Sequence, residues 1–248
     1  MKSVLERQYS VDISNVDMYM NLSLVSLMKF FQDMATRHSM ILGISYFDLK
    51  EKDNAFWVLS KFKVQVKNSL PVWGDEISIK TYPLEPQNIR SIRNYELHKG
   101  DELLMVASSE WCILDSDTRK PRRTSSISCY SNDINYLAEK LETEEFSKIA
   151  GEVEDGDFVY VKTVKLCDLD VNRHMNNVVY TEIALNCFSA DFLCDKKFNS
   201  YEVHFLKEAR EGDNIKVYKK EEGGSFVVVG KNDNGENYFK ASIDFEKI

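Results

Sequence analysis

A short polar segment near residue 170 carries the side chains best suited to chemistry. Asp170, Asn172 and His174 stand at alternate positions, and Asn177 follows shortly after them. A carboxylate and an imidazole can exchange protons near neutral pH, and an amide can hold a water or a carboxylate in place. Asp and Asn are also ordinary helix N-cap residues, so a structural role is the alternative. The grouping of four polar side chains favours a catalytic site.

The element that follows this segment would position a substrate. Residues 177–192 predict a helix that begins at Asn177. The first turn of a helix has unpaired N–H groups and a positive dipole end, which can polarise a carbonyl and hold a developing oxyanion. We therefore expect a carbonyl substrate to bind beside Asn177.

The predicted elements occur in the same order twice. Each half has a strand, a long helix and then four strands, which predicts an α+β fold from an internal repeat. In the first half the predicted elements are 6–12, 22–42, 58–67, 76–82, 88–98 and 102–115. In the second half they are 158–166, 177–192, 200–206, 214–220, 225–231 and 238–246. The predicted domains are 1–130 and 153–248, joined by a linker, 131–152, with a short helix at 137–149.

Short local matches set the expected alignment of the halves. Met20-Asn21 matches Met175-Asn176, and Gly74-Asp75 matches Gly212-Asp213. Ala107-Ser108 matches Ala241-Ser242. This alignment pairs a Tyr of the first half with His174, which predicts one functional site, in the second half. Two unrelated α+β halves remain the alternative.

Composition narrows the class of protein and partner. The chain has 248 residues, 43% hydrophobic and 29% charged, which is typical of a globular protein. No apolar run is long enough for a membrane span, and the first residues lack an apolar signal core, so we expect a cytoplasmic protein. The five cysteines are widely spaced, which indicates reduced thiols and no zinc site. A net charge of −8 argues against nucleic acid.

One cluster of positive charge departs from this trend. A basic run lies just after the last strand of the first half, and a solvated turn or a contact with an anionic partner would both explain it. The basic run consists of Arg119, Lys120, Arg122 and Arg123.

The run from Asp170 to Tyr180, Asp-x-Asn-x-His-x-Asn-Asn-x-x-Tyr, resembles the active-site signature of the acyl-acyl-carrier-protein (acyl-ACP) thioesterases. The similarity extends to segments 56–58, 71–75 and 111–122 of the first half. The resemblance implies a tandem hotdog fold, in which each long helix is wrapped by an antiparallel sheet. It also implies a substrate slot with a degenerate site in the first half and catalysis in the second.

The resemblance further implies the reaction and its residues. The family's catalytic Asp, Asn and His fall on Asp170, Asn172 and His174, and its Glu falls on Glu208. Plant members have a Cys after this Glu, whereas this chain has Ala209, which favours attack by water over a cysteine nucleophile. We therefore expect hydrolysis of fatty acyl-ACP to free fatty acid and ACP, with no metal ion and no cofactor.

Substrate and partner contacts follow from the same resemblance. The predicted substrate-binding residues are Met28, Phe31, Trp57, Asn176 and Asn177. Because ACP is acidic, the basic run is its expected docking site, with Arg90 and Arg93 behind it. Three alternatives stay open: an acyl-CoA thioesterase, a non-catalytic acyl-binding protein and a hotdog dehydratase. A homodimer is compatible with the sequence.

Overall fold

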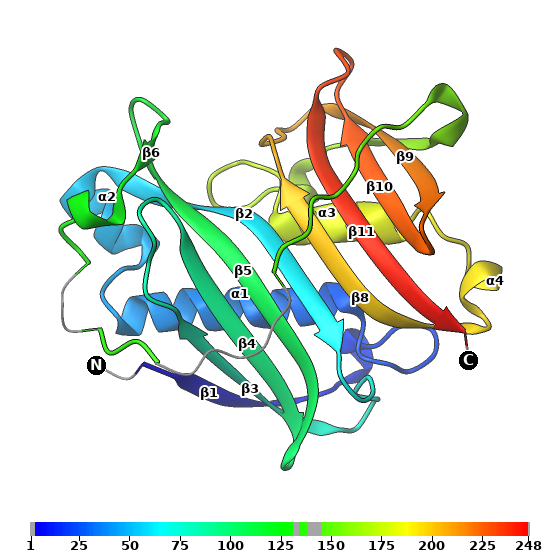
Figure 1. The fold of residues 1–248 in the computed structure, drawn as a ribbon, viewed down its shortest axis with the longest axis horizontal. Coiled ribbons are helices and arrows are strands. Elements are labelled where there is room, and N and C mark those ends of the chain that lie inside the picture. The colour runs from blue at the N-terminus through cyan, green and yellow to red at the C-terminus, as the bar shows by residue number, and fades with distance from the viewer. Residues whose placement is uncertain (1–2, 131–133, 138–144, 248) are drawn as a thin grey trace. The chain divides into compact units, whose positions relative to one another are not determined.

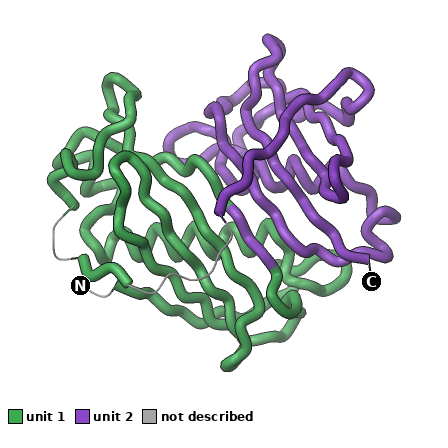
Figure 2. The backbone as a smooth tube through the Cα atoms, viewed as in Figure 1, with its two compact units in different colours: residues 1–62, 66–144 green, residues 63–65, 145–248 purple. Residues whose placement is uncertain are grey.

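The computed structural model of the chain describes residues 3–130, 134–137 and 145–247 (Figure 1). The chain divides into two compact units, residues 1–62 with 66–144 and residues 63–65 with 145–248 (Figure 2). Part of the expected linker, 131–152, lies outside the described residues, and the domain boundaries given above stay predictions.

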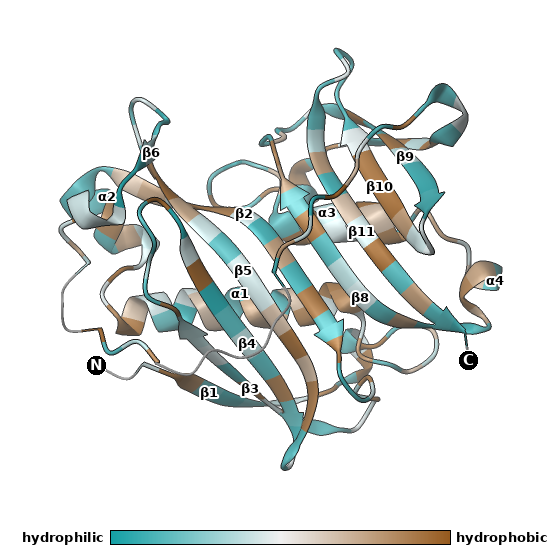
Figure 3. Cartoon of the chain, viewed as in Figure 1, coloured by the Kyte–Doolittle hydropathy of each residue, from teal (hydrophilic) through white to brown (hydrophobic). Residues whose placement is uncertain are grey.

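The first half is a sheet with a long helix, α1. The strands lie in the order β1-β3-β4-β5-β2, and the pairs β1–β3, β3–β4 and β4–β5 are antiparallel. Alternation of apolar and polar side chains along strands such as β2 gives the sheet one face for a core (Figure 3). The strands are β1 Leu5–Ser10, β2 Ala55–Val66, β3 Glu76–Pro83, β4 Ser91–Lys99, β5 Glu102–Asp115 and the short β6 Pro121–Arg122, which pairs with β5.

Helix α1, Leu24–Ile41, begins and ends where its sequence dictates. The Ser23 hydroxyl accepts the Ser26 N–H at the N-terminus. At the other end Gly43 adopts φ 70°, so that its N–H and that of Ile44 bond to the last turn of the helix. Its apolar face packs on the sheet through Phe31, whose ring centroid lies 4.6 Å from that of Tyr95. The predicted long amphipathic helix is confirmed.

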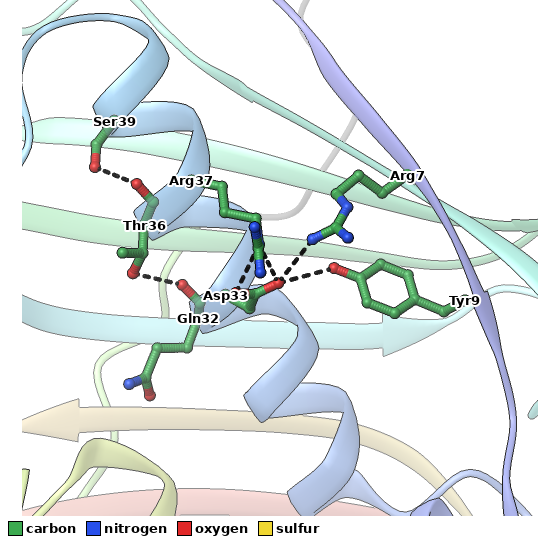
Figure 4. A network of polar contacts seen from close by, with 7 residues as sticks. All are labelled: Arg7, Tyr9, Gln32, Asp33, Thr36, Arg37 and Ser39. Atoms are coloured by element: carbon green, nitrogen blue, oxygen red, sulfur yellow. Dashed lines mark hydrogen bonds and ion pairs between the residues drawn. The ribbon is translucent and has the colours of Figure 1, made fainter.

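A polar network joins the outer side of α1 to the edge strand β1 (Figure 4). The Asp33 carboxylate binds Arg37 Nε at 2.8 Å and Arg7 Nη1 at 3.1 Å, and it accepts the Tyr9 hydroxyl at 3.3 Å. Burial and the Asp33 carboxylate raise the pKa of Tyr9. The ion pairs are partly exposed and contribute modestly to stability, but they fix how the edge strand meets the helix.

The second half repeats this arrangement. Its strand order, β8-β11-β10-β9-β7, corresponds element by element to that of the first half, which confirms the predicted repeat. Helix α3, Asn177–Leu185, buries Tyr180, whose ring meets those of Phe205 and Phe239 edge-on at 5.4 and 5.5 Å. The strands are β7 Phe158–Thr163, β8 Lys196–Phe205, β9 Asn214–Glu222, β10 Ser225–Lys231 and β11 Asn237–Lys247.

Two helical predictions need correction, and one helix was missed. The second long helix ends at Leu185, and a separate short helix, α4, Ala190–Leu193, starts where the Ser189 hydroxyl caps Phe192 N–H. Helix α2, Tyr46–Asp53, was not expected; a Ser45–Asp48 capping box begins it, and Leu49 anchors it in a buried cluster. Of the helix expected at 137–149, residues 145–149 are not helical and residues 138–144 lie outside the described chain.

Candidate active site

The polar segment forms a tight loop between β7 and α3. An isolated bridge pairs Leu169 with Met175, and Arg173 takes a left-handed conformation, φ 60°, at the turn between them. The Asp170 Oδ1 atom accepts the Asn172 N–H at 2.8 Å and the His174 N–H at 3.2 Å. The Asp170 carboxylate therefore holds the loop together by accepting two main-chain N–H groups of the turn.

The structure brings His174 and Glu208 together. Glu208 lies just beyond the end of β8, and its Oε2 atom is 3.4 Å from His174 Nε2. The Glu208 side chain is 30% exposed and that of His174 is 17% exposed, so the pair is open to a substrate yet partly shielded from water. A carboxylate and an imidazole at this distance can exchange a proton through one water, or directly after a small approach of the two side chains.

A main-chain bond couples the loop to the segment that carries Glu208. The Met175 N–H, next to His174, donates to the Ala209 carbonyl at 2.8 Å, and Ala209 is fully buried. Each catalytic candidate is thus one residue away from this shared bond. Asn172 is exposed on the same loop.

The first half contains the same loop without its chemistry. The Asp17 Oδ1 atom accepts the N–H groups of Tyr19 and Asn21 at 2.9 and 3.0 Å, and Met20 takes the left-handed conformation, φ 66°. Asp17 therefore corresponds to Asp170, Tyr19 to Asn172 and Asn21 to His174.

This correspondence corrects the predicted alignment by two residues. The Met-Asn dipeptides that guided it do not occupy equivalent places: Asn176 is the N-cap of α3, and its counterpart in α1 is Ser23. The match of Gly74-Asp75 with Gly212-Asp213 holds, since both glycines have φ 88° and both aspartates accept a nearby main-chain N–H.

Glu208 has no acidic counterpart in the first half either. Lys207 and Ala209 flank Glu208, whereas the matching Asn68 and Pro71 flank Ser69 and Leu70. The first half thus keeps the loop-building aspartate and lacks the imidazole and the glutamate. The aspartate accepts two main-chain N–H groups in both halves. His174 and Glu208 are the groups peculiar to the second half, and a catalytic part for Asp170 stays a prediction.

The remaining predicted substrate contacts have structural roles of their own. The Asn176 side chain accepts the Val178 N–H at 2.9 Å as the helix cap, and Asn177 is the first residue of α3. Phe31 and Met28 are 1% and 4% exposed in the core of the first half. The Trp57 Nε1–H donates to the Ile44 carbonyl at 2.8 Å. Their part in binding an acyl chain stays a prediction.

The basic run is only partly available to a partner. Arg122 donates to the main-chain oxygens of Asp53 at 2.6 Å and Ser126 at 2.9 Å, so it holds its own turn together. Arg119 lies over the Phe56 ring at 4.8 Å with its side chain outside the core. The exposed members of the basic run are Arg119, Lys120 and Arg123.

Of the two arginines expected behind the run, one is misplaced. Arg93 is 7% exposed, and its Nη1 atom donates to Thr81 Oγ1 at 3.2 Å and pairs with His38 Nδ1 at 2.9 Å. Burial lowers the pKa of Arg93. It faces the core and cannot meet a partner, whereas the Arg90 side chain is 64% exposed.

Comparison with solved structures places the fold in a class. A structure of an acyl-ACP thioesterase from Bacteroides thetaiotaomicron matches 98% of the chain and 98% of its own, with a TM-score of 0.88 and 24% identity. The 12:0-ACP thioesterase from Umbellularia californica matches over 100% of the chain and 99% of its own, with a TM-score of 0.83 and 18% identity. These matches confirm the predicted tandem hotdog fold.

The sequence comparison identifies the family. Residues 2–127 match the acyl-ACP thioesterase N-terminal domain, and residues 153–247 match the acyl-ACP thioesterase C-terminal domain. The chain belongs to the acyl-ACP thioesterase family.

A curated relative is the chloroplastic acyl-[acyl-carrier-protein] hydrolase FATB3 of Cuphea viscosissima, 27% identical over 201 residues, which are 76% of this chain and 48% of that protein. The palmitoyl-acyl carrier protein thioesterase of Arabidopsis thaliana is 23% identical over 83% of this chain and 52% of its own length. The chain spans about half the length of the curated relatives it matches. Among the described residues, no helix is both long and apolar enough to span a bilayer.

Proposed function

We propose that the chain hydrolyses the thioester of a fatty acyl-ACP, releasing the free fatty acid and ACP. The contact between His174 and Glu208, 3.4 Å apart beside the loop that precedes α3, is the observation that carries this proposal. Membership of the acyl-ACP thioesterase family supports the substrate class.

In the proposed mechanism Glu208 is the base. Of the two carboxylates, Asp170 already uses one oxygen for two main-chain N–H groups, whereas Glu208 reaches the imidazole of His174. Glu208 takes a proton from a water as the water oxygen attacks the thioester carbonyl carbon. The C–S bond then breaks, and the proton passes from Glu208 through His174 to the leaving thiolate.

The start of α3 supplies the electrostatic part of the mechanism. The thioester carbonyl binds against the positive end of the helix near Asn177, where oxygen charge develops during attack. Asn172, exposed on the loop, orients the water or the carbonyl. No cysteine nucleophile is available after Glu208, because Ala209 stands there, and attack by water needs none.

Carrier recognition is a further part of the proposal. A chain of net charge −8 needs a local positive surface to meet acidic ACP, and the exposed members of the basic run offer one. A cytoplasmic location and a homodimer are compatible with this function and stay predictions.

The direct test is a set of parallel rate measurements. The protein is incubated with acyl-ACPs of several chain lengths and with the matching acyl-CoAs, and the freed acids are identified. We expect a higher kcat/KM for acyl-ACP. A preference for acyl-CoA would favour the acyl-CoA thioesterase, ligand binding without hydrolysis would favour an acyl-binding protein, and loss of water from a 3-hydroxyacyl substrate would favour a dehydratase.

A further inference from the structure

The hydroxyl of Tyr180 bonds to the main chain on both sides of Glu208. Its Oη–H donates to the Lys207 carbonyl at 3.2 Å, and its oxygen accepts the Ala209 N–H at 3.3 Å. A phenol hydroxyl can donate one hydrogen bond and accept another at the same time. Burial raises the pKa of Tyr180, so the hydroxyl keeps its proton at any working pH.

The ring of Tyr180 has little freedom to move. It is 2% exposed and is held edge-on between Phe205, at the end of β8, and Phe239, on β11. A hydroxyl on so fixed a ring defines where the peptides before and after Glu208 lie. The direction in which the Glu208 side chain leaves the main chain follows from those two peptides.

The same contacts tie Glu208 to His174. The Ala209 peptide group that donates its N–H to Tyr180 also lies next to the carbonyl that accepts the Met175 N–H at 2.8 Å. Ala209, the residue after Glu208, is therefore hydrogen-bonded both to Tyr180 and to Met175, the residue after His174.

The first half of the chain provides an internal comparison. Leu27 occupies the place of Tyr180, each four residues after its helix N-cap, and Pro71 occupies the place of Ala209. Leu27 has no hydroxyl and Pro71 has no N–H to donate, although the Leu22 N–H still bonds to the Pro71 carbonyl at 2.7 Å. The first half, which has no counterpart of Glu208, therefore also lacks the clamp, by which we mean the two bonds of the Tyr180 hydroxyl to the main chain around Glu208.

We propose that Tyr180 is a positioning residue that holds Glu208 at its distance from His174, an inference that rests on the proposed function of this site. The two hydrogen bonds of the Tyr180 hydroxyl go to the main chain on either side of Glu208. Its removal should slow the chemical step and leave substrate binding unchanged.

The test compares Tyr180→Phe with Tyr201→Phe. Tyr201 is also fully buried in this half, and its hydroxyl accepts a hydrogen bond from the Thr181 hydroxyl at 3.2 Å, a bond that does not involve the main chain around Glu208. We expect Tyr180→Phe to lower kcat for acyl-ACP by about 10- to 100-fold, because a small misplacement of a catalytic group has an effect of this size, with KM unchanged. Tyr201→Phe should keep the parent kcat even if it lowers the melting temperature equally. Parental kcat in Tyr180→Phe would overturn the proposal.

A double-mutant cycle shows whether Tyr180 acts through Glu208. In a Glu208→Gln background, adding Tyr180→Phe should produce no further loss of kcat, since the group it positions is already gone. An equal fold loss in both backgrounds would mean that Tyr180 acts by another route, and it would refute the inference.

A second readout does not depend on turnover. The chain has four histidines, and the NMR signal of the His174 imidazole can be assigned by its loss in His174→Gln. At fixed pH, Tyr180→Phe should move this signal toward its position in Glu208→Gln, while Tyr201→Phe leaves it in place. An unmoved signal in Tyr180→Phe would reject the clamp. If the parent protein or Glu208→Gln shows that the proposed function is wrong, this measurement still decides the role of Tyr180.

Discussion

The two aspartates at the matching loops offer the sharpest distinction between a structural and a chemical carboxylate. Asp170 and Asp17 each accept two main-chain N–H groups, at 2.8 and 3.2 Å in the second half and at 2.9 and 3.0 Å in the first. If Asp170 is a loop builder, Asp170→Asn keeps an oxygen that can accept both bonds. If Asp170 is the base, the same change removes the reacting group.

The expected sizes of these two effects differ widely. A hydrogen bond to a charged group contributes about 1.5–3 kcal/mol when buried, and less here because the loop is partly exposed. Weaker bonds in Asp170→Asn affect the rate only by loosening the loop that carries His174. A loss of under about 1 kcal/mol in holding that loop lowers kcat/KM by a few-fold, since ~1.4 kcal/mol corresponds to a tenfold change. Removal of a general base reduces the rate by about 10²- to 10⁴-fold.

The assay measures kcat/KM and melting temperature for four proteins: Asp170→Asn, Asp170→Ala, Asp17→Asn and Asp17→Ala. We expect each alanine variant to lose more stability than its asparagine partner, with similar losses in the two halves. Activity should fall strongly only in Asp170→Ala, because Asp17 lies in a loop without His or Glu. A hundredfold loss in Asp170→Asn would show that the aspartate is the base and would refute the reasoning.

Three other predictions concern docking, pH and the core. Reversing the charge at the exposed basic run with Arg119→Glu, Lys120→Glu and Arg123→Glu should raise KM for acyl-ACP roughly tenfold and leave KM for a small acyl thioester unchanged; equal changes would reject docking there. The Ser45 hydroxyl and N–H lower the pKa of Asp48 from its ordinary value of 3.8. This carboxylate therefore stabilises the fold above that pH and ceases to do so as the pH falls through its folded-state pKa. Asp48→Asn should lower the melting temperature at pH 7, with a difference that shrinks as the pH falls below 3.8; a constant difference would contradict the capping role. Phe31→Ala should cost about 3–5 kcal/mol of unfolding free energy in denaturant titrations, and a loss below about 1 kcal/mol would mean that this side chain is not a core anchor.

Local patterning predicted most of the regular structure. The strands of both halves follow the two-residue alternation of apolar side chains, and α1 follows the helical spacing of a face anchored by Phe31. The early end of α3 was missed because the apolar residues continue past Leu185, while Ser189 starts a new helical turn. Hydrogen-bonded caps decide such boundaries, and composition does not reveal them.

The candidate site could also be predicted only in part from the sequence. The types of residue in the loop, together with the family resemblance, pointed to His174 and Glu208, but the register of the repeat was wrong by two residues. A shared Met-Asn dipeptide is weaker evidence than the Asp-and-turn geometry that both loops keep, and this geometry appears only in the hydrogen bonds. The place of Arg93 in the core and the contacts of Tyr180 also depend on partners far away in the sequence.

The central claim is that His174 and Glu208 in the second half hydrolyse a fatty acyl-ACP. Single-turnover release of fatty acid from acyl-ACP, measured for the parent, His174→Gln and Glu208→Gln after each is shown to be folded, tests it most directly. The account predicts release by the parent and a rate lower by at least about a hundredfold in each variant. Parental rates in Glu208→Gln would contradict it.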